Sequence, residues 1–493
     1  MTSDPAPRRL HPATLISRWL RIIPQMAAGG IGVAAGIARE GFGGILLFAF
    51  IAMLAGLAIA LLVWWRFSYT VGAGEIVIEK GVLHRQRRVI PFDRVQDISI
   101  EQPLLARLFG TARVKIETGG AGADEGSLDM IGLADARLLR DHIKRGQAAP
   151  VAEETEAAEP VLFEMRLGRL LLSGLFNFSL VFLAAIVAGL QYLDQFDLVD
   201  WEQVIAAEQK GAAAGLVTIR TTLILIGLVL LLGVAAGVIR TVARDFGFRL
   251  TRTEAGLRRR RGLLTLSEIV IPLRRTQVAL IESGPVGRLL GWHALSFQTL
   301  GADRKEGGVQ VAAPFARIEA LLPILAEAGF PPPPPRAEFR GLPRRGLLRR
   351  VLAWLVLALA AGIAASIVLP EAGFGVAALL VLALLAVLRW RKHTYLVGER
   401  ALFVSRGLLK RRLWIIPFEK TQTISTSRGP VQRRLRLASL LVDTAGASAI
   451  RAPEIVDLDG GDADALAERL LASFHDARAV IRLQSGLISS PTR

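Results

Sequence analysis

The feature that most constrains this chain is a segment that occurs three times. The copies begin at Gly81, Gly262 and Gly407, and they align without a gap over residues 81–120, 262–301 and 407–446. Self-similarity of this kind predicts repeated structural units rather than one large core. The columns identical in all three copies are Gly81/Gly262/Gly407, Leu83/Leu264/Leu409, Ile90/Ile271/Ile416, Pro91/Pro272/Pro417, Gln96/Gln277/Gln422, Arg107/Arg288/Arg433, Thr118/Thr299/Thr444 and Gly120/Gly301/Gly446.

Pairs of long apolar stretches precede the three copies. Hydrophobic residues make up 52% of the 493 residues, and a helix of about 20 apolar residues can cross a bilayer. We therefore predict three membrane-embedded α-helical hairpins. The first stretch is the weakest because it is rich in Gly and Ala, and a cleaved signal peptide is its alternative reading. The predicted spans are Ile22–Ala38, Gly41–Trp65, Leu170–Tyr192, Thr221–Ile239, Val351–Pro370 and Ala372–Leu388.

Basic residues flank these stretches, whereas the predicted hairpin tips are neutral or acidic. Arg18 and Arg21 precede the first pair, and Arg389 and Arg391 follow the last. Lys and Arg are retained on the cytoplasmic side of a membrane, so the N- and C-termini are expected to be cytoplasmic. The net charge of +17 favours anionic lipid head groups, and not nucleic acid, as the partner.

Within each copy, alternating apolar and polar residues indicate strands. Residues 113–117 alternate cleanly, and residues 77–83 are typical of a strand, a Gly turn and a second strand. Leu133–Lys144 has helical spacing, and Ile318–Ala326 and Ala463–Phe474 occupy the same place in the later copies. Each unit is thus predicted to be a bent antiparallel sheet or small barrel with one C-terminal helix.

These residues carry a resemblance. A predicted hairpin followed by Gly-[Val/Leu]-Leu, Pro-[Phe/Leu] and Gln resembles the bacterial pleckstrin-homology (PH)-like domain family, and three such units in one chain resemble its YdbT-type membrane proteins. The resemblance implies a seven-stranded, strongly bent sheet in each unit, no known catalysis, a role at the bacterial cell envelope and often a smaller one-unit PH-like membrane partner. Two departures stand out: Glu268 replaces a basic or apolar residue, and Arg436 replaces Gly110 and Gly291, which puts the last strands of the third unit in doubt.

The sequence offers no site for catalysis. Cys is absent, which excludes thiol chemistry and Cys-based zinc sites. No two His residues have ligand spacing, and no Ser lies in a nucleophile elbow. We expect no metal, no cofactor and no enzymatic activity. Transport is disfavoured because the predicted spans carry almost no charge at their centres.

Basic clusters recur on the early hairpin of each unit, and we consider them candidates for contact with anionic lipid. The alternative is that they reflect only the positive-inside bias and a solvated strand face. The repeat-signature residues, in contrast, are predicted to be structural. The candidate lipid contacts are Arg85, Arg87, Arg88, Arg258, Arg259, Arg260, Arg261, Lys410, Arg411 and Arg412; the structural set is Gly81, Pro91, Gln96, Gly262, Pro272, Gln277, Gly407, Pro417 and Gln422.

The predicted organisation follows from these patterns. It comprises a cytoplasmic segment (1–21), hairpin 1 (22–65), PH-like domain 1 (66–146), an acidic linker (147–164), hairpin 2 (165–239) with an acidic external loop (193–215), PH-like domain 2 (240–329), a Pro-rich linker (330–343), hairpin 3 (344–391), PH-like domain 3 (392–476) and a basic tail (477–493).

We interpret the chain as a non-enzymatic, multi-pass protein of the bacterial inner membrane. Three cytoplasmic PH-like domains would act as a scaffold or binding platform in envelope maintenance or in stress or antimicrobial defence. The alternative function is a transporter or export-complex component whose PH-like domains are regulatory.

Overall fold

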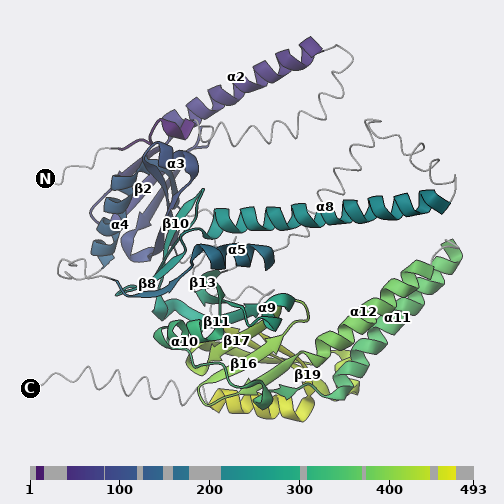
Figure 1. Ribbon diagram of the computed structural model, residues 1–493. Helices are drawn as coiled ribbons and strands as arrows, with labels where there is room; N and C mark the ends of the chain where they lie inside the picture. The colour runs from purple at the N-terminus through teal and green to yellow at the C-terminus, as the bar shows by residue number, and fades with distance from the viewer. Residues whose placement is uncertain are drawn as a thin grey trace, which may run out of the picture. The chain divides into compact units, whose positions relative to one another are not determined.

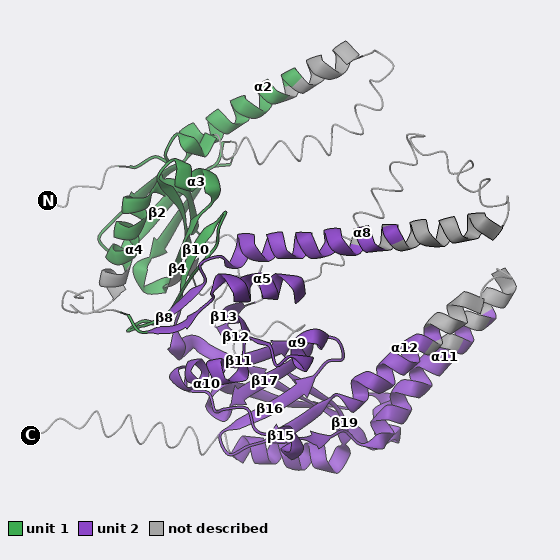
Figure 2. Ribbon diagram, in the orientation of Figure 1, with its two compact units in different colours: residues 1–160, 251–270, 303–305 green, residues 161–250, 271–302, 306–493 purple. Residues whose placement is uncertain are grey.

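The computed structural model describes residues 7–15, 42–82, 84–118, 126–147, 159–176, 212–299, 308–368, 373–444 and 453–472. The chain forms two compact units, which Figure 2 colours separately. Unit 1 comprises Met1–Pro160, Thr251–Val270 and Asp303–Lys305, and unit 2 comprises the remainder. The boundary between the units therefore runs through the second repeat.

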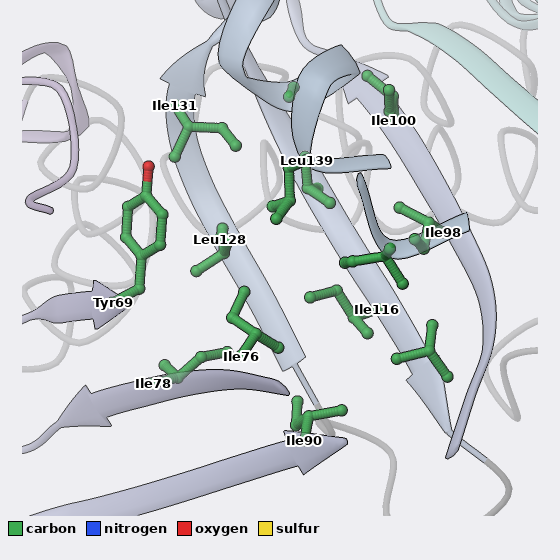
Figure 3. Close-up of a cluster of buried hydrophobic side chains, with 14 of the residues drawn as sticks. Tyr69, Ile76, Ile78, Ile90, Ile98, Ile100, Ile116, Leu128, Ile131 and Leu139 are labelled. Carbon is green, nitrogen blue, oxygen red and sulfur yellow. The ribbon is translucent and has the colours of Figure 1, made fainter. Parts of the chain in front are cut away.

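The first repeat, in unit 1, consists of two three-stranded antiparallel half-sheets and a helix around one core. Alternation places Ile76 and Ile78 of the first half-sheet inward, opposite Val114 and Ile116 of the second. Figure 3 shows Ile76, Ile78 and Ile116 in this core, with Leu139 of the helix among them. The elements are β1 (Ser68–Val71), β2 (Glu75–Lys80) and β3 (Gln86–Pro91), then β4 (Val95–Gln102), β5 (Thr111–Thr118) and β6 (Gly126–Gly132), with α3 (Leu104–Leu108) and α4 (Leu133–Gln147).

The second half-sheet of the first repeat continues into the first half-sheet of the second repeat. In unit 1 the strand order is β6-β5-β4-β10-β9-β8, because β4 pairs with β10. The added strands are β8 (Arg249–Thr253), β9 (Gly256–Arg261) and β10 (Leu266–Ile271).

Unit 2 repeats this arrangement one step further along the chain (Figure 1). Its large sheet has the order β13-β12-β11-β17-β16-β15-β14, and a separate sheet β18-β19-β20 follows. The strands are β7 (Val161–Glu164), β11 (Thr276–Ser283), β12 (His293–Thr299), β13 (Val309–Ala316), β14 (Arg340–Gly341), β15 (Thr394–Val397), β16 (Ala401–Arg406), β17 (Arg411–Pro417), β18 (Thr421–Ser427), β19 (Leu437–Thr444) and β20 (Glu454–Asp459). The short helices are α9 (Pro285–Leu289), α10 (Ile318–Glu327) and α13 (Pro430–Arg434), and residues 460–472 form a helix.

The predicted strands and C-terminal helices of each repeat are present, but their grouping into sheets differs from the prediction. Each repeat was expected to close its own seven-stranded sheet. Instead, a seven-stranded sheet combines half of one repeat with half of the next. Alternation in a sequence identifies strands and their inward faces, but strand edges carry no comparable pattern, so the pairing could not be foreseen.

The membrane-hairpin part of the predicted fold is wrong. Among the described residues, no helix combines the length and the apolar character needed to cross a membrane. Ile22–Ala38 and most of Leu170–Tyr192 lie outside the described residues. The prediction rested on the apolar composition of these stretches alone. The helices found in the remaining predicted stretches are α2 (Phe42–Arg66), α5 (Leu167–Phe176), α8 (Ala212–Asp245), α11 (Arg344–Val368) and α12 (Gly373–Arg391).

The repeat signature forms the same turns three times. The Gly that opens each copy has φ of 111°, 116° and 115° at Gly81, Gly262 and Gly407, a region open mainly to glycine. A Cβ there would lie 1.9–2.1 Å from a carbonyl oxygen three residues later. This backbone conformation accounts for glycine at all three positions.

The Pro and the Gln of the signature also have structural positions. Each Pro precedes a short 3-10 turn, at η2 (Phe92–Arg94), η3 (Leu273–Arg275) and η6 (Phe418–Lys420). The register of the following strand shifts at the Gln in every copy, between Val95 and Asp97, Thr276 and Val278, and Thr421 and Thr423. The Gln thus marks a β-bulge that recurs in all three copies, and such a bulge bends the strand.

The last strands of the third repeat form despite the missing glycine. Arg436 has φ of 54°, close to 62° at Gly110 and 72° at Gly291. A non-glycine residue there costs about 1–2 kcal/mol. The backbone carbonyl of Arg436 accepts a hydrogen bond from Gly460 N at 2.8 Å, which helps to hold the conformation.

Candidate functional site

The strands that join successive repeats form two seams with the same register. In unit 1, Glu101 of β4 lies opposite Ser267 of β10. In unit 2, Glu282 of β11 lies opposite Arg412 of β17. Glu101 and Glu282 occupy one column of the repeat, as do Ser267 and Arg412. The chain thus uses one mode of strand addition twice.

An arginine that is identical in all three copies makes a hydrogen bond across both seams. Arg107 Nη1 donates to the carbonyl oxygen of Leu263 at 2.8 Å, and Arg288 Nη2 donates to that of Leu408 at 2.9 Å. Leu263 and Leu408 directly follow the signature glycines. The arginine column therefore contacts the Gly turn of the next repeat. Sequence reasoning noted this identical column but assigned it no role.

Charged side chains fill the seams in a complementary way. In unit 2, Glu282 accepts from Lys410 Nζ and Arg412 Nε, each at 2.9 Å. Burial alone would raise the pKa of Glu282, but these two partners outweigh it and lower the pKa below its ordinary value. In unit 1, Glu268 accepts from Arg140 Nη1 of α4 at 3.0 Å. Glu268, an apparent departure from the family pattern, is thus part of a seam.

Among the described strands, the two at the ends of the series of repeats, β3 and β18, have no such neighbour. Within the described part of the chain, β3 pairs only with β2, and β18 pairs only with β19. Residues 86–89 of β3 are exposed, whereas β17 is half-buried to buried throughout. Most of β18 is likewise exposed, whereas β11 is buried except at Glu282. Both ends therefore present open strand edges.

The residues of the predicted basic clusters lie in three different environments: the open strand β3, the protein interior and the second seam. Arg85, Arg87 and Arg88 are exposed on or beside the open strand β3. Arg259 is fully buried at 0% exposure, and Arg258 Nη1 lies 2.6 Å from Glu159 Oε1. Lys410 and Arg412 take part in the second seam. The structure does not bring the candidates together into one site, and anionic-lipid contact stays a prediction for the exposed members.

The third repeat contains a buried ionic cluster that sequence reasoning missed. Asp457 of β20 is fully buried and has φ of 65°. Its carboxylate accepts from Arg349 Nη2 at 2.9 Å, Arg350 Nε at 3.0 Å and Gln432 Nε2 at 2.9 Å. Burial opposes ionisation, but these donors together lower the pKa of Asp457 below its ordinary value. The cluster fastens β20 to α11.

A buried histidine lies beside this cluster. Burial, together with the charges of Arg350 and Arg406, lowers the pKa of His393 to about 4. Phe67 and Phe248 occupy the same column in the other repeats and are also buried. His393 therefore replaces a core aromatic residue, in keeping with a structural position.

The described residues contain no group of His, Cys, Asp and Glu that could hold a metal ion. What the geometry offers is a set of strand edges with defined register and charge. Strand edges act chemically by pairing with another extended segment.

Family comparison agrees with this architecture. The family model described as Bacterial PH domain matches residues 22–147, 174–328 and 347–474. The chain therefore belongs to the bacterial PH domain family, and the resemblance inferred from the threefold signature is confirmed. The chain is 24% identical over 427 residues to the UPF0699 transmembrane protein YdbT of Bacillus subtilis (strain 168), covering 83% of this chain and 85% of that protein. No solved structure matches significantly.

Proposed function

We propose that this chain is a non-enzymatic, membrane-associated binding platform built from three PH-like repeats. The observation that carries the proposal is the pair of open strand edges at the ends of a repeat array. A platform of this kind suits a scaffold role in envelope maintenance or in stress or antimicrobial defence. The relative whose name describes a transmembrane protein supports the membrane part of the proposal.

Exposed apolar side chains on several helices also support membrane association. On α8, Leu231 is 65% exposed and Ile239 is 68% exposed; on α11, Val356 and Leu359 are 65% and 67% exposed. Soluble surfaces rarely expose contiguous apolar patches, and such patches mark membrane or protein contacts. Lipid would cover these side chains favourably, at roughly 25 cal/mol for each Å² removed from water.

Membrane fractionation with two washes tests this proposal. The tagged full-length chain is expected in the membrane fraction and to remain there in high salt, because apolar attachment is not screened by salt. Detergent should release it. Recovery in the supernatant without detergent would refute membrane association.

The same experiment separates apolar attachment from attachment by the basic clusters. If arginines of the clusters carried the binding, high salt would release the chain. The variant R85Q/R87Q/R88Q should then also bind the membrane more weakly, by about 1 kcal/mol for each arginine. The matched control R274Q/R400Q/R434Q removes the same charge from exposed positions elsewhere.

The platform role is tested by gentle solubilisation and affinity purification through a C-terminal tag. A stoichiometric second protein is expected, such as a smaller one-unit PH-like membrane protein. A chain that purifies alone with one enriched anionic lipid would contradict the platform role and favour lipid binding.

A further inference from the structure

The strand β3 is one half of a seam whose other half is missing from the described chain. We propose that β3 binds, by strand addition, the outer strand of a PH-like half-sheet from a different protein, and that this strand carries a carboxylate in the column of Glu101 and Glu282. The inference rests on the proposed platform function and specifies its partner.

The backbone of β3 provides the first argument. Its counterparts β10 and β17 are each paired on both edges, whereas β3 is paired on one edge among the described residues. An open strand edge presents a row of N–H and C=O groups that is a template for pairing with another strand. The two internal seams show which kind of strand this edge of the repeat accepts and in which register.

The side chains of β3 provide the second argument. Arg85, Arg87 and Arg88 make this edge strongly basic, and Glu79 lies 3.7 Å from Arg87 on the neighbouring strand. The strand β17 also begins with basic residues, and it meets Glu282 there. An incoming strand with a carboxylate in the Glu282 column would thus find several guanidinium groups within reach, and charge-assisted hydrogen bonds of this kind are strong.

A partner with a whole half-sheet would also supply the arginine that follows the pairing strand. In both seams the short helix after the incoming strand carries the arginine that donates to the Gly turn. Val82 follows Gly81 in the first repeat, in the place of Leu263 and Leu408. A partner with a PH-like half-sheet would bring an equivalent arginine to the Val82 carbonyl, which an isolated strand would not.

A second copy of this chain fits the edge poorly. In the register of the internal seams, Ser427 of β18 would lie opposite Gln86, and Arg428 would lie opposite Arg85. The strand β18 has Ser427 where β4 and β11 have glutamate. Like charges directly opposite one another destabilise a strand pair, so the chain disfavours pairing with itself.

The absence of cysteine from the sequence permits a disulfide-trapping experiment with purified full-length chains. One chain carries Val89→Cys on β3. A second chain carries Ile424→Cys on β18, the position that faces residue 89 in the seam register, as Ala279 faces Ile415. The intramolecular pair A279C/I415C sets the rate for an aligned seam.

Three versions of the second chain act as probes. The first has wild-type β18, the second has S427E/R428Q to restore the acidic seam column, and the third has the neutral control S427Q/R428Q. We expect the glutamate probe to form the intermolecular disulfide at least about tenfold faster than the glutamine probe, since a charge-assisted pair is worth about 1.5 kcal/mol or more. Adding R85Q/R87Q to the first chain should abolish the difference.

Three results would overturn the proposal. Equal rates for the glutamate and glutamine probes would remove the carboxylate requirement. Wild-type β18 reacting as fast as the glutamate probe would make a second copy the occupant. No intermolecular disulfide with any probe, while A279C/I415C closes, would show that β3 does not accept a strand. Because the readout is a disulfide between purified chains, it can fail while membrane association stands, and the reverse also holds.

Discussion

The half-sheets β11–β13 and β18–β20 are copies of one another within unit 2, but only the first lies inside a continuous sheet. At the column of Ala279, Leu280 and Ile281, which are buried, the terminal half-sheet has Ile424, Ser425 and Thr426, of which the last two are exposed. The strand paired on both edges, β11, thus carries buried apolar side chains, whereas the strand paired on one edge, β18, carries exposed polar ones.

The terminal half-sheet, β18–β20, is held by a buried ionic contact in place of a seam. The sheet β11–β13 is held by its seam to β17, whereas β18–β20 is held to α11 through the buried carboxylate of Asp457. The same repeat position is Met130 in the first half-sheet, where it packs against Ala13 and Ala106. One position therefore serves as an apolar contact at one end of the array and as an ionic anchor at the other.

The largest expected effect comes from breaking this anchor. Asp457→Asn keeps a side chain that tolerates positive φ but leaves Arg349 and Arg350 without their charged partner. Loss of one partner of a buried ion pair costs about 3–5 kcal/mol. Urea titration of the free energy of unfolding and hydrogen exchange in β18–β20 measure the loss. Asp459→Asn, whose carboxylate is 42% exposed and 3.6 Å from Arg345, should cost at most about 0.5 kcal/mol; equal losses for the two variants would contradict the anchor.

The second prediction concerns pH. Because the pKa of His393 falls from 6.5 unfolded to about 4 folded, the unfolded state binds more protons between these values. Stability should therefore decrease as pH falls from about 6.5 to about 4, by up to roughly 3 kcal/mol at 1.36 kcal/mol per pKa unit. His393→Phe, which restores the residue type of Phe67 and Phe248, should remove that slope in urea titrations at stepped pH. An unchanged slope would mean that His393 is not the titrating group.

The repeats could be predicted from the sequence, but the reason why the two half-sheets differ could not. The signature predicted the three repeats, which the family comparison confirms, and their strands, which are present. It could not predict the seams, because pairing depends on which edges meet in space. Glu268 looked like a departure from the pattern for the same reason, since its partner Arg140 lies in the preceding repeat. The membrane hairpins were inferred from apolar composition alone, and no described helix meets the length and apolar character needed to cross a membrane.

A third prediction weakens the interior seam itself. Glu282→Gln removes the carboxylate that binds Lys410 and Arg412 but keeps its size. The side chain of Glu282 is 16% exposed and its partners are 58% and 37% exposed, so solvent screening limits the expected loss to about 1–2 kcal/mol. Hydrogen exchange should rise in β11 and β17. Glu419→Gln is the control, because that carboxylate is 44% exposed and 4.0 Å from Lys420. Unchanged exchange in β17 would contradict a role for Glu282 in the seam.

The smallest effect compares one arginine column at a seam and at an open end. Arg288 donates across the seam to Leu408, whereas Arg433 donates only locally, to the carbonyl of Arg428 at 3.2 Å, among the hydrogen bonds described. Arg288→Ala should therefore cost about 1 kcal/mol, the net value of one hydrogen bond, and increase exchange at residues 407–410. Arg433→Ala should cost close to nothing, since its bond is exposed. Equal losses of stability in the two variants would mean that this arginine stabilises its own half-sheet. Arg433 would then not be a seam residue that lacks its acceptor. If only Arg288→Ala lowers the stability, the arginine contributes through its hydrogen bond across the seam. Arg433, which has the same place in the repeat, would then be available to a partner whose strand pairs with β18.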